Sequence, residues 1–272
     1  MKTRLLFVGD THCGLKVGLL PKGYKDEYGK PYNLGASQKL IAQILDKIKK
    51  KAAKDCDELL LVLMSDFVQG PGEDHPREMD TQDVKEQCDM FIHSILPLAH
   101  KAKKIYSVNA LSRFHADPGQ FADDYIASEL GAYGRRSKIR IDLVVGGIHF
   151  RFKHHGPTLG YRPHTRGDAV RRFLRDSHTE ALESGETTPD VFVFAHWHQH
   201  YWESVKVRGP QGDRILQAFY TPPMTFPDKR TQNVVQRLDE VQIGMIALDV
   251  EDGKVTEQKW FERFSTRTVI RH

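Results

Sequence analysis

The chain has 272 residues and carries 40 Lys and Arg against 36 Asp and Glu, which gives a formal net charge of only +4 at pH 7. This length can bury one large core, and α/β folds of this size commonly form a single domain, so we expect one domain over residues 1–272. The longest purely apolar run, residues 59–64, is far shorter than the roughly 20 residues that span a bilayer, and residues 1–8 lack the apolar region of a signal peptide. The three cysteines are scattered without CxxC spacing, which indicates reduced thiols. We therefore expect a cytoplasmic protein without a membrane partner.

Five apolar runs are predicted to form buried strands, and each is followed by residues that can bind a metal ion. The runs are residues 3–8, 58–64, 104–108, 148–153 and 191–194. Open α/β sheets bind ligands at the carboxyl ends of their strands. Five runs that all end in a carboxylate, an amide or an imidazole therefore indicate one shared site.

Four helices are predicted between and after these strands, over residues 37–54, 81–103, 118–130 and 167–182. The first is amphipathic, with Ser37 as a candidate N-cap, and Pro97 would kink or break the second. Helices alternate with strands early in the chain, and strands joined by short turns follow from residue 191 to residue 264. This order indicates two packed sheets flanked by helices.

The candidate metal ligands are Asp, His and Asn side chains, and most of them come in closely spaced pairs. No single pair is specific, because short polar pairs at strand ends commonly just cap turns. Mixed Asp, His and Asn ligands favour Mn, Fe, Zn or Co over the all-oxygen sites of Mg or Ca. In chain order the candidates are Asp10, His12, Asp66, Asn109, His155, His196 and His198.

This ordered set resembles the motifs of the calcineurin-like metallophosphoesterase superfamily, and the match runs from Val8 to His198. Asp10 and His12 fall on the motif DxH, Asp66 on GDxxD/R, Asn109 on GNH, His155 on a lone histidine before glycine, and His196 and His198 on GHxH. The resemblance implies a four-layer αββα sandwich of two mixed β-sheets flanked by helices. It also implies two divalent metal ions bridged by Asp66, with manganese as our first choice and Fe, Zn, Co or Ni as alternatives.

One departure from the motifs concerns catalysis. The chain has Ala110 where the GNH motif has a histidine, which in the family can protonate the leaving group. Arg113 and His115 follow closely enough in sequence to substitute for it. An alignment shifted by one residue would place Ala110 on the asparagine instead, and a loop histidine is more often solvated or structural than catalytic.

The charge is unevenly distributed along the chain. Residues 135–175 contain 11 Lys and Arg against 2 Asp and Glu, whereas residues 55–90 contain 2 against 11. Within the basic stretch, Arg162 and Arg166 are candidates for binding a phosphate-bearing substrate, and Tyr161 for stacking on a base. The alternative interpretation is an ordinary solvated helix face.

These patterns predict a two-metal phosphoesterase, with a preference for a phosphodiesterase or nuclease of the DNA-repair exonuclease or phage type. Water bound to such ions is acidified and serves as the nucleophile, so no protein nucleophile is required. The expected substrate is a nucleic acid or nucleotide phosphodiester. Two alternatives stay open: a phosphomonoesterase or small-nucleotide hydrolase, and a metal-binding but catalytically weak module that binds nucleic acid or a protein partner.

Overall fold

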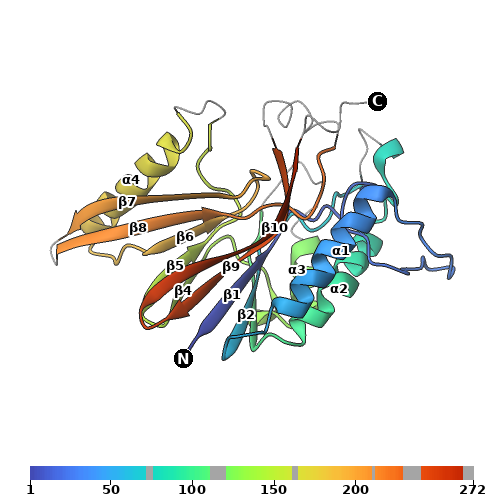
Figure 1. Cartoon of the computed structure of the whole chain (residues 1–272), viewed down its shortest axis with the longest axis horizontal. Helices are drawn as coiled ribbons and strands as arrows, with labels where there is room; N and C mark the ends of the chain where they lie inside the picture. Colours follow the sequence, from blue (N-terminus) through green and yellow to red (C-terminus); the bar gives the residue numbers. More distant parts are fainter. Residues whose placement is uncertain (72–75, 111–120, 161–164, 210–211, 229–239, 266–272) are drawn as a thin grey trace.

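Two five-stranded mixed sheets form the centre of the molecule (Figure 1). The computed structural model describes residues 1–71, 76–110, 121–160, 165–209, 212–228 and 240–265. The first sheet has the strand order β10-β9-β1-β2-β3 and the second has the order β4-β5-β6-β8-β7. In chain order the strands are β1 (Thr3–Val8), β2 (Glu58–Leu63), β3 (Lys104–Ser107), β4 (Ile141–Val145), β5 (Ile148–Phe152), β6 (Val191–Phe194), β7 (Tyr201–Gly209), β8 (Gly212–Tyr220), β9 (Glu240–Glu251) and β10 (Lys254–Ser265).

Helices cover the outer face of each sheet. In Figure 1, α1 (Ala36–Lys51), α2 (Val84–Ala99) and α3 (Phe121–Glu129) lie on one side of the first sheet, and α4 (Asp168–Ser184) lies against β7 and β8 of the second. Three separate apolar clusters fill the spaces between the four layers. The predicted four-layer αββα sandwich of two mixed β-sheets is confirmed.

Strand β1 shows why both faces of the first sheet are buried. Leu5 and Phe7 belong to the cluster between the two sheets, whereas Leu6 and Val8 belong to the cluster under the helices. Successive side chains of a strand point to opposite faces, so a strand that is apolar at every position can only lie between two packed layers. The uninterrupted apolar runs in the sequence therefore indicate strands that are buried on both faces.

The parallel strand pairs bring the predicted ligand-bearing loops to one edge of the sandwich. β1, β2 and β3 pair in parallel, with Val8 opposite Leu63 and Leu63 opposite Ser107. In the second sheet β5 pairs in parallel with β6, with Phe152 opposite Val193. Each strand ends level with its neighbour, and the loops that follow leave the sheet side by side.

Two local predictions need correction. Ser37 is not the N-cap of the first helix: α1 begins at Ala36, the N-cap is Gly35, and its backbone N–H donates to Gln38 Oε1 at 2.9 Å. The second helix ends at Ala99, two residues after Pro97, and not at residue 103, and Pro97 has no N–H to donate to the carbonyl four residues earlier. Strand β4, at the edge of the second sheet, was not predicted, and its first four residues alternate between partly buried and exposed.

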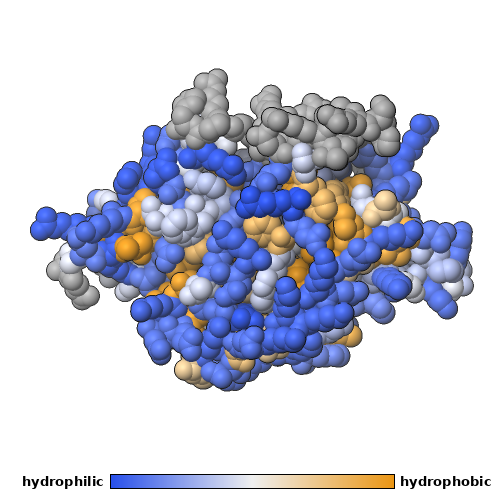
Figure 2. Space-filling model, in the orientation of Figure 1, coloured by the Kyte–Doolittle hydropathy of each residue, from blue (hydrophilic) through white to orange (hydrophobic). Residues whose placement is uncertain are grey.

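The length and hydropathy of the described helices bear on whether any of them could cross a membrane. None of them is long and apolar enough to cross a bilayer. Hydrophilic side chains cover most of the face seen in Figure 2, and apolar side chains show between them in small areas.

Candidate metal centre

The turns after β1, β2 and β6 hold several side chains in an uncommon backbone conformation. Among the described residues nine non-glycine residues have positive φ, and six of them are Asp10, His12, Ser65, Asp66, His196 and His198. Such backbone conformations cost on the order of 1–3 kcal/mol each and persist where the surroundings fix them. Here backbone hydrogen bonds fix them, since the N–H groups of Asp10 and His12 donate to the carbonyls of Ser65 and Asp66 at 3.0 and 3.2 Å. These turns bring the Asp and His side chains among them together, whereas Ser65 bonds to Asp123.

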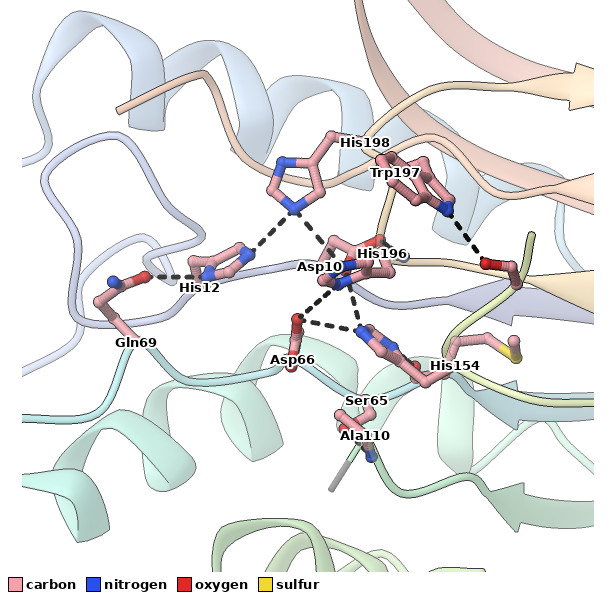
Figure 3. Close-up of polar contacts among 12 residues, drawn as sticks. Asp10, His12, Ser65, Asp66, Gln69, Ala110, His154, His196, Trp197 and His198 are labelled. Atoms are coloured by element: carbon pink, nitrogen blue, oxygen red, sulfur yellow. Dashed lines mark hydrogen bonds and ion pairs between the residues drawn. The ribbon is translucent and has the colours of Figure 1, made fainter. Parts of the chain in front are cut away.

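One group of potential ligands in these turns consists of Asp10, His12 and His198, with their ligand atoms within 4.8 Å of one another. The Nε2 atoms of His12 and His198 are 3.2 Å apart, and His198 Nε2 is 3.7 Å from Asp10 Oδ1 (Figure 3). Two imidazole nitrogens and a carboxylate oxygen therefore converge on one small volume. This is the donor set that the DxH and GHxH motifs were predicted to supply.

A second group consists of Asp10, Asp66 and His154, and a third of His154, His155 and His196. His154 Nε2 lies 3.0 Å from Asp66 Oδ2 and 4.0 Å from Asp10 Oδ1. His196 Nδ1 lies 3.9 Å from the same Asp66 oxygen. Asp10 is shared by the first two groups and His154 by the last two, so the three groups form one continuous cluster in which Asp66 faces two histidines.

The residues present fit a divalent cation. Asp10 is completely buried, and among the described residues its Oδ1 atom has no hydrogen-bond partner. Burial raises the pKa of this carboxyl, the nearby His154 opposes that rise, and Asp66 adds to it. A buried carboxylate oxygen that faces imidazole nitrogens without a hydrogen bond is costly unless a cation lies between them. Mixed carboxylate and imidazole donors favour borderline metals over Mg or Ca.

The pKa values of the two adjacent histidines differ in direction. Burial lowers the pKa of His154, but the charges of Asp66 and Asp10 outweigh it and raise this pKa to about 9. Burial and the neighbouring His154 and His196 lower the pKa of His155 to about 4. The negative charge that retains a proton on His154 would equally retain a metal ion in its place, with release of that proton. His155 is neutral at physiological pH and needs to lose no proton to become a ligand.

His154 was missed by the sequence interpretation, which selected His155 for the lone-histidine motif. The structure brings both together, but His154 is the buried one, at 1% exposure, and lies closer to Asp66. The period-2 pattern of β5 contained the signal: Phe150 and Phe152 point into the space between the sheets, and His154 is the next residue in that alternation. His155, which follows His154 in sequence, belongs to the third group of potential ligands.

Two ligand candidates have the outer nitrogen of the ring held by a neighbouring acceptor. His12 Nδ1 donates to Gln69 Oε1 at 2.9 Å, and His154 Nδ1 donates to the Met64 carbonyl at 2.5 Å. The backbone N–H of Gln69 is bound in turn by Gln87 Oε1 at 3.0 Å. These partners keep a proton on Nδ1, so Nε2 is the nitrogen that faces the cluster and that can bind a metal ion once it carries no proton.

Replacement of Gln69 by Ala is expected to weaken metal affinity by about 10- to 100-fold, the usual effect of losing such a partner of a ligating histidine. Gln69→Glu keeps an oxygen acceptor for His12 and should retain most of the affinity. Competition of Mn²⁺ between the protein and a chelator measures both variants. Unchanged affinity in Gln69→Ala would show that His12 needs no such support.

The residues after β3 lie against the same turns. Asn109 and Ala110 are buried, and the Ala110 N–H donates to Ser65 Oγ at 3.0 Å. Ser65 Oγ donates to Asp123 Oδ2 at 2.7 Å, which links α3 to the turn that carries Asp66. Burial raises the pKa of Asp123 to about 7, the hydrogen bond from Ser65 opposes this, and the charge of Asp66 adds to it.

The raised pKa of Asp123 predicts a pH-dependent stability in the metal-free protein. Its ordinary pKa is 3.8. Because the folded pKa lies above the unfolded one, the contribution of Asp123 is complete below pH 3.8 and is lost as pH rises through 7, at no more than about 1.4 kcal/mol per pH unit. Asp123→Asn keeps an acceptor for Ser65 without the charge. It should raise Tm relative to wild type at pH 8 and leave it nearly unchanged at pH 4, measured in chelator; an equal difference at both pH values would contradict this.

Of the remaining predicted residues, the structure describes Arg166. Its Nη2 donates at 2.9 Å to Oε1 of Gln199, the residue that follows His198 in sequence. Its guanidinium lies over the Tyr201 ring, 5.2 Å from the ring centroid. Arg166 therefore lies beside the GHxH turn. Four other predicted residues fall outside the described residues: Arg113, His115, Tyr161 and Arg162.

A groove of about 740 Å³ opens next to the cluster and shares His155 with it. Its lining carries both charges, and Phe173 and Phe194 contribute apolar surface. The charged lining residues are Lys153, Arg172, Asp168, Asp176 and Glu180. The groove runs between the loop after β5 and helix α4. Its volume lies in the range typical of small-molecule sites.

Comparisons with known proteins give distant likenesses only. No protein-family model matches the chain, and no curated protein matches it. Among solved structures, an archaeal phosphodiesterase is 11% identical, with a TM-score of 0.42 over 94% of this chain and 98% of that chain. A metallophosphoesterase from Sphaerobacter thermophilus is 12% identical, with a TM-score of 0.38 over 96% and 88%, and Vps29 from Chaetomium thermophilum is 10% identical, with a TM-score of 0.40 over 96% and 97%. Because these identities and TM-scores are low, our interpretation of the site depends on its own residues.

Proposed function

We propose that this protein is a metal-dependent phosphoesterase that uses two divalent ions. The observation that carries the proposal is the convergence of two buried carboxylates and five imidazoles from four strand ends on one cluster. Five of these seven residues also stand at the ligand positions of the DxH, GD and GHxH motifs. A structural ion pair or a buried polar network would not require so many imidazoles whose ring nitrogens lie this close together.

Each part of the cluster has a role in this proposal. Asp10, His12 and His198 hold one ion, and His154, His155 and His196 hold the other, with Asn109 as a further ligand and Asp66 between the two. When bound, two such ions polarise the phosphoryl group and activate water, so the protein need not supply a nucleophile. The carboxylates of Asp10 and Asp66 offset the positive charge of the ions, and their burial strengthens this attraction because bulk water screens it less.

We further propose that the substrate is a phosphodiester, of the nucleic-acid or nucleotide kind. Arg166 supports this, because it places a permanent positive charge beside the GHxH turn. The basic composition of residues 135–175 supports it as well.

The reaction class is tested with two chromogenic esters in the presence of Mn²⁺. A phosphodiesterase should hydrolyse bis-p-nitrophenyl phosphate faster than p-nitrophenyl phosphate. The reverse order would indicate a monoesterase. Elemental analysis of the purified protein, with about two equivalents of a transition metal expected, tests the site independently of any substrate.

The preference for nucleic acid predicts a salt dependence. Affinity for single- or double-stranded DNA should fall steeply as salt rises, and charge reversal of Arg162 and Arg166 should flatten the slope by about one unit for each lost phosphate contact. Arg208→Glu is the matched control, because Arg208 is exposed near the far end of β7. An affinity that does not change with salt concentration would favour a small-molecule substrate.

One observation favours a second candidate, a metal-binding module with weak catalysis. Ala110, at the position of the GNH histidine, has no titratable group that could protonate a leaving group. Such a module would bind two equivalents of metal yet hydrolyse neither chromogenic ester.

A further inference from the structure

A chain of hydrogen bonds holds the side chain of Asn109 from outside the cluster. Asn109 Nδ2 donates to Ser137 Oγ at 3.1 Å, and Ser137 Oγ donates to Asp124 Oδ1 at 2.6 Å. The same carboxylate oxygen accepts the backbone N–H of Ser137 at 2.8 Å. Asn109 and Ser137 are both buried, at 4% and 8% exposure. Asp124 lies in the first turn of α3, so three separate segments meet here.

The direction of these bonds is dictated by which atoms can donate. An ionised carboxylate only accepts, so the single hydroxyl proton of Ser137 goes to Asp124. The hydroxyl oxygen then has only lone pairs left for Asn109, and it must receive an N–H from the amide. A flipped amide would place its carbonyl oxygen against those lone pairs, with no proton between them. These hydrogen bonds therefore select one of the two orientations of the Asn109 amide.

The backbone around Asn109 is held at the edge of the metal centre. The N–H of Asn109 donates to the Lys138 carbonyl at 2.8 Å on one side. On the other side the next residue, Ala110, donates to Ser65 Oγ at 3.0 Å, and Ser65 precedes Asp66. With Nδ2 turned toward Ser137, the carbonyl oxygen Oδ1 points away from Ser137, because the two atoms are the two in-plane substituents of Cγ.

We propose that Ser137 and Asp124 are positioning residues that orient the Asn109 amide so that its carbonyl oxygen, and not its NH₂ group, is presented to the metal centre. This rests on the proposed function, in which Asn109 is a ligand. An asparagine binds a cation only through its oxygen, so an amide free to flip would present a non-ligating NH₂ group for part of the time. Partners that fix the orientation of a ligand typically contribute 10- to 100-fold to metal affinity.

The test measures Mn²⁺ affinity by chelator competition, without any substrate. Ser137→Ala should weaken the affinity for one of the two ions by about 10- to 100-fold. Asn109→Asp in the Ser137→Ala background should restore it, because a carboxylate presents an oxygen whichever way it turns. Thr188→Val is the matched control: it removes a buried hydroxyl that bonds to His178 Nδ1 at 3.0 Å behind the second sheet, and it should leave Mn²⁺ affinity unchanged.

The outcomes separate this inference from the proposed function. If Asn109→Ala binds Mn²⁺ like wild type, Asn109 is no ligand and the ligand set of the proposed function is wrong. If Asn109→Ala weakens binding but Ser137→Ala does not, the positioning role alone is overturned. Loss of affinity in Ser137→Ala without rescue by Asn109→Asp also overturns it, since Ser137 would then act only through local stability. Should Ser137→Ala fail to fold, Asp124→Ala frees the serine hydroxyl to turn and allows the same rescue experiment.

Discussion

Replacement of Asp66 by Asn is expected to abolish phosphoester hydrolysis and to remove most of the bound metal. Asp66 is 5% exposed, and its Oδ2 lies 3.0 Å from His154 Nε2 and 3.9 Å from His196 Nδ1. The substitution keeps the size of the side chain but removes the negative charge that faces both histidines. A bridging carboxylate offsets the charge of two ions, so its loss affects both of them. Elemental analysis and hydrolysis of bis-p-nitrophenyl phosphate measure the two effects.

Two further variants make this result specific. His198→Ala should mainly weaken the ion shared with Asp10 and His12, because His198 belongs to that group alone. Asp142→Asn removes a carboxylate that pairs with Arg151 and Arg140 on the surface of the second sheet, and it should change neither metal content nor rate. Two equivalents of metal with full activity in Asp66→Asn would refute the assigned role of Asp66.

The layers of the fold could be predicted from the sequence because apolar runs report burial on both faces. Residues 3–8 have no polar alternation that would place one face in water, and β1 is indeed covered by the second sheet on one side and by helices on the other. Strand β4 escaped prediction for the opposite reason. As an edge strand it alternates between exposed and partly buried residues, and its apolar Val144 is 66% exposed.

The candidate metal ligands were easier to predict from the sequence than the residues that hydrogen-bond to them. Asp10, His12, His196 and His198 lie in short motifs directly after strands, where local spacing places the side chains. The choice between His154 and His155 required the alternation of β5, which a motif does not encode. Gln69 stands at the last position of GDxxD/R, but the motif does not show that it bonds to His12, 57 positions away; Ser137 has no local signal, because it is defined only by a bond to a residue 28 positions away.

Replacement of His115 by Ala is expected to slow the hydrolysis of natural phosphodiesters, which have alkoxide leaving groups, by about 10² to 10⁴-fold, the usual contribution of general acid catalysis. Hydrolysis of bis-p-nitrophenyl phosphate should be nearly unchanged, because nitrophenolate leaves without protonation. We expect His115 to supply the proton because Ala110, at the position of the GNH histidine, cannot. Where the GNH motif carries an acid this chain carries a methyl group, and His115 is the nearest histidine that follows in sequence.

The leaving-group comparison also shows what the alternatives predict. If Ala110→His, added to His115→Ala, restores cleavage of DNA but leaves the nitrophenyl rate unchanged, the two histidines perform the same proton transfer from different positions. A uniform loss with both substrates in His115→Ala would instead indicate a role in folding or metal binding. No loss with either substrate would remove His115 as the acid, and Arg113 would not replace it, because a guanidinium is a poor proton donor at neutral pH. Comparing rates across leaving groups therefore identifies the chemical step at which the residue acts, which a single loss of activity would not.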